Sequence, residues 1–283
     1  MEIASYFLQG WRWTLLLRPV GRISTLQTTR AVYVGLLTNA VLPMRIGELS
    51  RAYMISRWME IEIVRVLPSI ILERLIDGIW LVLFIGLALM LVQLPPHIQT
   101  SADIMGGFIL FMTVLFIFIA LYKPKGQLKM YRPKWKPVCW FMDFINKLSV
   151  GLREIGFSKI LAITFFASLG FIIFQGLGFW LMIMGYGVSL SFLKVGVVIL
   201  IIILGTSIPN APSNIGSFQF FTVLGLTLFG VDKTTATGYS MVSFVLLSMM
   251  FFIFGLWGLL TGGISFATIK REALNIRRIR NPC

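Results

Sequence analysis

Charged residues are scarce in this chain, and their scarcity indicates its class. Of the 283 residues, 13% are Asp, Glu, Lys or Arg and 57% are hydrophobic, whereas soluble domains carry roughly 25% charged residues. Four long stretches hold no such side chain: residues 78–102, 160–193, 195–231 and 234–269. A membrane span needs about 20 mostly apolar residues. The chain is therefore predicted to be an all-α, polytopic helical membrane protein.

Cysteine and histidine are nearly absent as well. Cys139 and Cys283 are the two cysteines, and because both fall in segments predicted to be cytoplasmic, no disulfide framework follows. The one histidine, His97, lies in a short predicted outer loop, so neither a metal site nor any other cofactor is expected. Residues 1–22 lack the basic region and the small-residue cleavage site of a signal peptide. They are predicted to form a short span, an interfacial helix or the end of a first helix.

Positive charge is unevenly distributed. The net charge is +14, and of the 25 Lys and Arg residues nine lie in residues 123–159 and five in residues 270–280. Such clustering follows the positive-inside rule, so nucleic-acid binding is not expected. Residues 123–158 are predicted to form a basic cytoplasmic loop with an amphipathic helix, and the C-terminal tail is predicted to be cytoplasmic. The protein is expected to be a multi-pass protein of the cell membrane.

Two apolar segments break at prolines. About 26 residues separate Arg30 from Arg57, with a break at Pro43, and residues 192–231 break within "SIPNAPSNIGSFQ". Proline disrupts helices, and neither segment has room for two crossings and a turn, so each is predicted to be a re-entrant helical hairpin. The breaks read P-M-R-I-G and P-S-N-I-G, and three predicted crossings separate them. The hairpins are thus expected to enter from opposite faces.

Oppositely oriented, broken helices are typical of inverted-repeat transporters. The prediction is a single integral membrane domain over residues 1–283, with inverted-repeat halves of roughly 6–122 and 159–269. Non-helical backbone at this depth must be buried in protein or line a wet cavity.

Charged residues gather beside the first break and in the next predicted span: Arg45, Glu48, Arg51, Glu73, Arg74 and Asp77. The first three recur at three-residue spacing, roughly on one helix face, and Glu73 lies one turn from Asp77. Charges at membrane depth are costly. One interpretation is therefore a paired network that pins the hairpin against the span without a ligand. The other is a pocket for a charged head group, in which Arg45 and Arg51 bind a phosphate.

The second break carries a different set of candidate residues. Ser213 and Asn214 are predicted to cap the following half-helix, and Gly216 to permit close backbone approach. Gln219 is predicted to hydrogen-bond either a ligand or a neighbouring helix. Both hairpins aim the N-terminus of a half-helix at the bilayer centre, where the helix dipole favours an anion. The candidate binding residues therefore also include Pro43, Gly47 and Pro212.

These motifs resemble the transmembrane, flippase-like region shared with lysylphosphatidylglycerol synthases. The family pattern runs N-x-x-[LI]-P-x-R-x-G-E-x-x-R, then E-R-x-x-D, and later P-x-x-P-G-x-[IL]-G-x-[FY]-[EQ]. Residues 39–51, 73–77 and 209–219 match it in turn. Ser213 stands where the family often has glycine, and Gln219 where many members have glutamate.

The resemblance implies lipid translocation without lipid synthesis, because no soluble transferase domain follows in the sequence. The first hypothesis is a flippase or transporter that moves an anionic phospholipid, polyprenyl phosphate or glycolipid between leaflets. No ATP-binding loop is present, so transport would be downhill, ion-coupled or driven by downstream consumption.

The alternatives are an intramembrane lipid-modifying transferase or hydrolase, with Glu48, Glu73 and Asp77 as bases or metal ligands, and a non-transporting scaffold of an envelope-lipid enzyme. The protein is not expected to be an enzyme; its expected partners are membrane lipids, and a homodimer is compatible with the sequence.

Overall fold

The computed structural model describes residues 1–42, 46–91, 100, 103–104, 106–111, 114, 159–207 and 211–263. Within these ranges all regular structure is helical and no strand occurs. Two helices, α7 (Lys159–Gly185) and α10 (Lys233–Gly262), are long and apolar enough to cross a membrane. The prediction of an all-helical chain with membrane-spanning helices is confirmed to this extent. Pro43, Arg45, His97, the 123–158 loop and the C-terminal tail lie outside the described residues.

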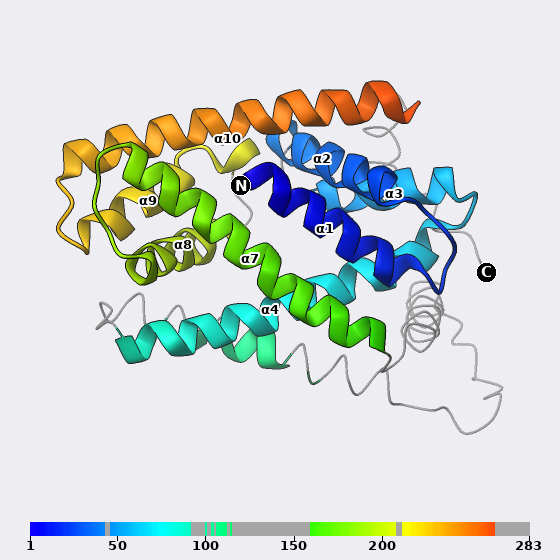
Figure 1. The fold of residues 1–283 in the computed structure, drawn as a ribbon, viewed down its shortest axis with the longest axis horizontal. Coiled ribbons are helices and arrows are strands. Elements are labelled where there is room, and N and C mark those ends of the chain that lie inside the picture. The colour runs from blue at the N-terminus through cyan, green and yellow to red at the C-terminus, as the bar shows by residue number, and fades with distance from the viewer. Residues whose placement is uncertain are drawn as a thin grey trace, which may run out of the picture.

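The order of elements recurs along the chain (Figure 1). A helix, a pair of short helices and a long helix come first: α1 (Glu2–Leu17), α2 (Thr25–Val41), α3 (Gly47–Trp58) and α4 (Ile63–Leu91). The second series is α7, α8 (Phe192–Thr206), the 3-10 turn η1 (Pro212–Asn214), α9 (Ser217–Thr227) and α10.

Local sequence sets several helix ends. The Ser24 hydroxyl accepts a hydrogen bond from the backbone N–H of Gln27 at 3.3 Å, and the Gln27 side chain accepts one from the N–H of Ser24 at 3.1 Å. This capping box begins α2. Asp232 caps α10 by accepting from the N–H of Thr234 at 2.9 Å. Gly263 ends α10 in a left-handed conformation, with φ of 67°.

Helix α1 packs antiparallel against α7. Glu2 lies against Gly178 and Leu8 against Gly170, so the end of α1 lies where α7 begins (Figure 1). Of the alternatives for the N-terminal residues, the structure has a 16-residue helix packed among α2, α4 and α7. Side chains of α1, α2 and α3 build the largest part of the apolar core, including Trp13, Tyr33 and Ile55.

Both pairs of short helices fold back on themselves as helical hairpins. In the first, α2 packs on α3 where Gly35 meets Gly47, and the N–H of Gly47 donates to Asn39 Oδ1 at 2.7 Å. In the second, α8 packs on α9 where the Phe221 ring lies over Gly205. Glycine is needed at these crossings, because a Cβ at Gly47 would overlap the backbone oxygen of Gly35.

The two hairpins open toward opposite ends of the bundle. The open end of the first lies beside the end of α10, where Trp58 Nε1 donates to the carbonyl of Gly262 at 3.0 Å. The open end of the second lies beside the start of α10, because α8 follows the end of α7 and α9 leads directly into α10. The turn η1 packs against α2, so the closed end of the second hairpin lies beside the first hairpin, partway along the bundle (Figure 1).

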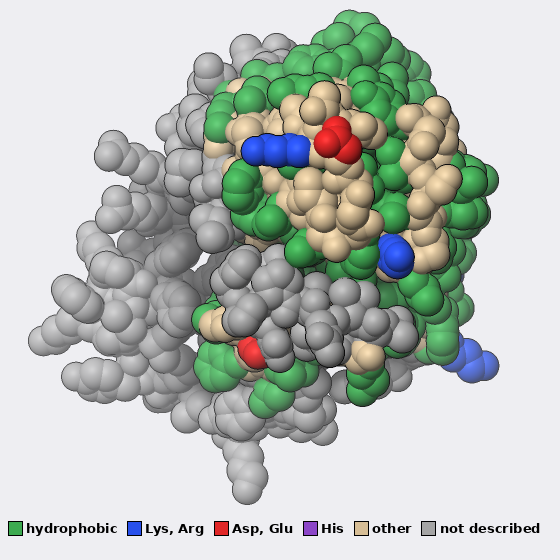
Figure 2. All heavy atoms as spheres, turned by 90° about the vertical axis from the view of Figure 1, so that its left-hand side faces the viewer, with side chains coloured by type: hydrophobic (Ala, Val, Ile, Leu, Met, Phe, Trp, Pro, Cys, Tyr) green, Lys and Arg blue, Asp and Glu red, His purple; other side chains and the backbone are tan. Residues whose placement is uncertain are grey.

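The two ends differ in charge. We call the end where α1 stops and α4 starts the basic end, because its loops and helix termini carry Arg18, Arg22, Arg57, Arg65 and Lys159, which outnumber Glu60 and Glu62. The opposite end, where α7 stops and α10 starts, carries Lys194, Asp232 and Lys233. Figure 2 looks at this opposite end, where hydrophobic side chains surround backbone and uncharged polar side chains, and charged side chains are sparse among the described residues.

Candidate functional site

Six charged side chains from three helices form one contiguous group, the charge cluster: Arg12, Glu48, Arg51, Glu73, Arg74 and Asp77. Helix α1 supplies the first, α3 the next two, and α4 the last three. With three arginines and three carboxylates, the formal charges within the cluster cancel.

Glu73 is the centre of the charge cluster, and its side chain is fully buried. Its Oε1 lies 3.0 Å from Nη2 of Arg12, 3.2 Å from Nη1 of Arg51 and 3.0 Å from Nη2 of Arg74. Gln9 Nε2 also donates to the same oxygen at 2.8 Å. A buried carboxylate is tolerated only when it is paired and hydrogen-bonded, and here four donors converge on it.

Arg12 ties three helices together and was missed as a candidate binding residue. Its guanidinium donates to both carboxylate oxygens of Asp77 on α4, one of them at 3.1 Å, and to Ser168 Oγ on α7. The side chain is fully buried, with its carbon Cζ 5.5 Å from the ring centroid of Phe171. The signal in the sequence is an arginine inside an otherwise apolar stretch, "FLQGWRWTLLL".

Arg51 is largely buried and engaged by its neighbours. Besides Glu73, its Nη2 contacts Glu48 Oε2 at 2.6 Å, one helical turn away. Its guanidinium also lies 4.8 Å from the ring centroid of Trp13, within the range of cation–π attraction. Glu48 and Arg51 thus share one face of α3, as their spacing predicts. The described geometry contains the paired network, while phosphate binding by Arg51 stays a prediction.

Arg74 and Glu48 form the exposed edge of the charge cluster. Their side chains are 48% and 38% exposed, and Arg74 Nη2 lies 3.6 Å from Glu48 Oε1. The Asp77 side chain is 20% exposed and lies 4.0 Å from Arg74 Nη1. These three side chains are therefore the accessible part of the charge cluster, whereas Glu73 is enclosed.

The residues of the second break form a turn rather than a helix cap of the expected kind. Ser213 and Asn214 lie in η1 with φ of 57° and 55°, and neither side chain caps α9. The cap comes from Gln219, whose Oε1 accepts a hydrogen bond from the N–H of Gly216 at 2.7 Å. The predicted caps are therefore wrong, because both residues are used to turn the chain.

The backbone at Gly216 is left-handed, and the close backbone approach expected there stays a prediction. An added Cβ would meet no described atom within 4 Å, and its φ is 86°. The glycine is therefore required by the left-handed backbone rather than by close packing. No hydrogen bond or ion pair among the described residues joins Pro212, Ser213, Asn214, Gly216 or Gln219 to the charge cluster.

The described residues contain no group of three or more His, Cys, Asp or Glu side chains placed to hold a metal ion.

Comparison with known proteins agrees with the motifs. The family model "lysylphosphatidylglycerol synthase TM region" matches residues 1–266, which include every member of the charge cluster and both hairpins. No curated protein and no solved structure matches the chain. The chain belongs to the family of lysylphosphatidylglycerol synthase transmembrane regions.

Proposed function

We propose that the protein is a lipid translocator, which moves an anionic phospholipid, polyprenyl phosphate or glycolipid between membrane leaflets. The observation that carries this proposal is the charge cluster. The family consists of membrane regions of lipid synthases, which favours a lipid as the substrate. The six charged side chains within a helical bundle favour a lipid with a charged head group. Charged residues inside membranes commonly mark substrate pathways.

The two hairpins are proposed to be re-entrant and related as an inverted repeat. The order of elements recurs, and corresponding pairs pack in the same way, since α2 lies on α3 and α10 while α8 lies on α9 and α4. The hairpins open to opposite ends of the bundle, and the closed end of the second lies beside the first. Alternating access in such transporters consists of one repeat rocking against the other.

Charge supports a membrane orientation. The basic end collects the arginines of the α1–α2 and α3–α4 connections, and excess Lys and Arg in short loops faces the cytoplasm. We therefore place the basic end, with the 123–158 loop and the tail, on the cytoplasmic side of the cell membrane.

The exposed edge is proposed to receive the head group. Arg74 is half exposed, and its contact with Glu48 is long, so exchanging that contact for a phosphate costs at most about 1 kcal/mol. Glu73 stays bound to Arg12 and Arg51, because removing one partner of a buried pair costs about 3–5 kcal/mol. Arg45, from the sequence, adds a second cation for the phosphate, and the first turn of α3 contributes its helix dipole.

Lipid exchange in liposomes tests this function. Purified protein is reconstituted with a fluorescent phosphatidylglycerol, phosphatidylethanolamine or polyprenyl phosphate, and exchange is followed by chemical quenching of the outer leaflet. We expect protein-dependent exchange, reduced about tenfold for anionic lipids by Arg74→Ala, as for a lost hydrogen bond to a charged group. Arg65→Ala, at an exposed position on the same helix, is the matched control and should leave exchange unchanged.

The same experiment separates the alternatives. Exchange no faster than in empty liposomes for every lipid would refute translocation. A chemically altered lipid, found by mass spectrometry of the extracted vesicles, would instead establish the intramembrane enzyme.

A further inference from the structure

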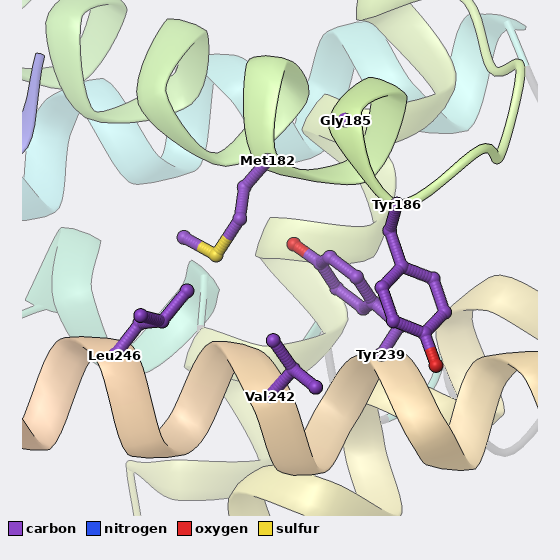
Figure 3. A pocket seen from close by; sticks show the side chains of 6 residues that line it. All are labelled: Met182, Gly185, Tyr186, Tyr239, Val242 and Leu246. Carbon is purple, nitrogen blue, oxygen red and sulfur yellow. The ribbon is translucent and has the colours of Figure 1, made fainter.

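A small apolar pocket lies between α7 and α10 near the end of the bundle opposite to the basic end. Its volume is about 250 Å³, and its lining comes from the last turn of α7 and the first half of α10: Met182, Gly185, Tyr186, Tyr239, Val242 and Leu246 (Figure 3). The charge cluster uses none of these residues.

The hydroxyl group of Tyr239 is a buried polar group of the pocket that lacks a hydrogen-bond partner among the described residues. The side chain is 1% exposed, and its oxygen has no hydrogen-bond partner. Figure 3 shows the hydroxyl directed into the space between the helices, toward Met182 and Leu246. By contrast, the Tyr186 hydroxyl points away and lies over Gly238. Buried hydroxyl groups are normally hydrogen-bonded, so the pocket calls for an occupant with an acceptor.

The depth of Tyr239 identifies that acceptor. Helix α10 has 30 residues, which gives a length of about 45 Å at 1.5 Å per residue and matches a bilayer with its head-group layers. Tyr239 lies six residues after Lys233, or about 9 Å from the helix start. The hydrocarbon core of about 30 Å leaves roughly 7 Å of head-group layer on each side. The backbone of Tyr239 is therefore close to the boundary where phospholipid ester groups lie, and its hydroxyl group points from there toward the bilayer centre.

The surface around the pocket is apolar. Large exposed hydrophobic side chains flank it on both helices: Leu181, Met184, Met241, Val245 and Met249. In a helix that crosses a membrane, such side chains face lipid. An occupant therefore enters from the bilayer and carries a hydrocarbon chain.

We propose that this pocket binds a glycerophospholipid at the junction between its ester group and its acyl chain. The Tyr239 O–H donates a hydrogen bond to an ester carbonyl, and the first methylenes of the acyl chain pack against Met182, Val242 and Leu246. This inference rests on the proposed membrane placement of the bundle. It adds to the proposed translocator a lipid site in the leaflet opposite to the basic end.

A hydrogen bond from Tyr239 to an ester carbonyl predicts a preference for ester-linked over ether-linked phospholipids. Nonspecific contact between lipid chains and an apolar surface gives no such preference. Ester-linked phospholipids offer a carbonyl at this depth, whereas ether-linked phospholipids of the same chain length do not. Protein in nanodiscs is labelled with photoactivatable phosphatidylglycerol in its diester and diether forms, and the adducts are mapped by mass spectrometry. We expect adducts to concentrate on residues 182–186 and 239–246, with the diester favoured about fivefold, as for one hydrogen bond.

Two variants, with one control, test the apolar space of the pocket and the Tyr239 hydroxyl group separately. Leu246→Trp should fill it and abolish the concentrated labelling, while Val245→Trp, at the neighbouring exposed position of α10, should not. Tyr239→Phe should keep the labelling and lose the diester preference. Thermal melting in detergent verifies that each variant is folded.

The outcomes separate this inference from the proposed function, because labelling requires no transport. Concentrated, diester-selective labelling without lipid exchange would uphold the site and refute translocation. Labelling spread evenly along the exposed faces of α7 and α10, or unaffected by Leu246→Trp, would overturn the site whether or not lipids exchange. A diester preference that survives in Tyr239→Phe would refute the role of the hydroxyl group.

Discussion

Replacing Glu73 with glutamine removes one charge from the centre of the charge cluster with little change in shape. The side chain is fully buried, forms ion pairs with three guanidinium groups and accepts a hydrogen bond from Gln9. Glutamine offers those donors a weaker, neutral acceptor and leaves the cluster with one net positive charge.

The Glu73→Gln substitution does not weaken the contacts of the three arginines equally. Arg12 retains its paired contact with Asp77, and Arg74 is 48% exposed and stays hydrated. Arg51, whose side chain is 4% exposed, retains Glu48 as its one carboxylate partner, beside its contact with the Trp13 ring. Leaving one buried charge without its main partner costs about 3–5 kcal/mol. Removing the half-exposed partner with Arg74→Gln should cost at most about 1 kcal/mol.

The assay is reversible unfolding in mixed detergent micelles, followed by the fluorescence of the eight tryptophans. We expect the free energy of unfolding to fall by about 3–5 kcal/mol in Glu73→Gln and by at most about 1 kcal/mol in Arg74→Gln. The double variant Arg51→Gln with Glu73→Gln restores neutrality. It should be more stable than the sum of its single variants predicts, by about 1 kcal/mol or more.

Two results would refute this reasoning. The first is an equal loss of stability in Glu73→Gln and Arg74→Gln. The second is additivity of the effects of the Arg51 and Glu73 substitutions on the free energy of unfolding. Either result would mean that the charge cluster does not hold α1, α3 and α4 together.

Two further predictions concern the hairpins, and both are measured by thermal melting in detergent. Gly47→Ala places a Cβ 2.6 Å from Asn39 Oδ1 and against the backbone of α2. It should destabilise the protein by about 1–3 kcal/mol, whereas Gly86→Ala, with no described atom within 4 Å, should change stability by less than about 1 kcal/mol; equal effects would contradict the close crossing. Gln219→Ala should cost about 1 kcal/mol through loss of the cap on Gly216, while Gln219→Glu keeps the acceptor and should keep the melting temperature. A loss of stability in Gln219→Glu equal to that in Gln219→Ala would show that the amide oxygen is not what stabilises the turn.

The helix breaks were readable from the sequence because their causes are local. Proline and glycine impose their backbone preferences wherever they occur, and the helices end at Val41 and Thr206 and restart at Gly47 and Ser217. The same locality explains the i,i+3 pair of Glu48 and Arg51. The roles of Ser213 and Asn214 were misjudged because both residue types favour helix caps and left-handed turns alike, and sequence does not choose between these conformations.

The contacts of Arg12 could not be predicted from its sequence neighbours. It lies 65 positions from Asp77 and 156 from Ser168, and no periodicity joins residues on three different helices. Gln9, its neighbour one turn earlier, was missed for the same reason. The uncharged, mostly apolar flanks of Arg12 were the one available signal that this charge would be buried.

The sequence by itself determined that the chain is a helical membrane protein, where its hairpins break, and which residues carry charge into apolar segments. These properties follow from composition and from contacts within one helix, which spacing along the chain encodes. Only the tertiary structure decided which charges pair, that Glu73 is their centre, and that Tyr239 faces a pocket. Those facts depend on how separate helices pack. The apolar and polar faces of a helix follow from its sequence, but they do not specify which other helices it contacts.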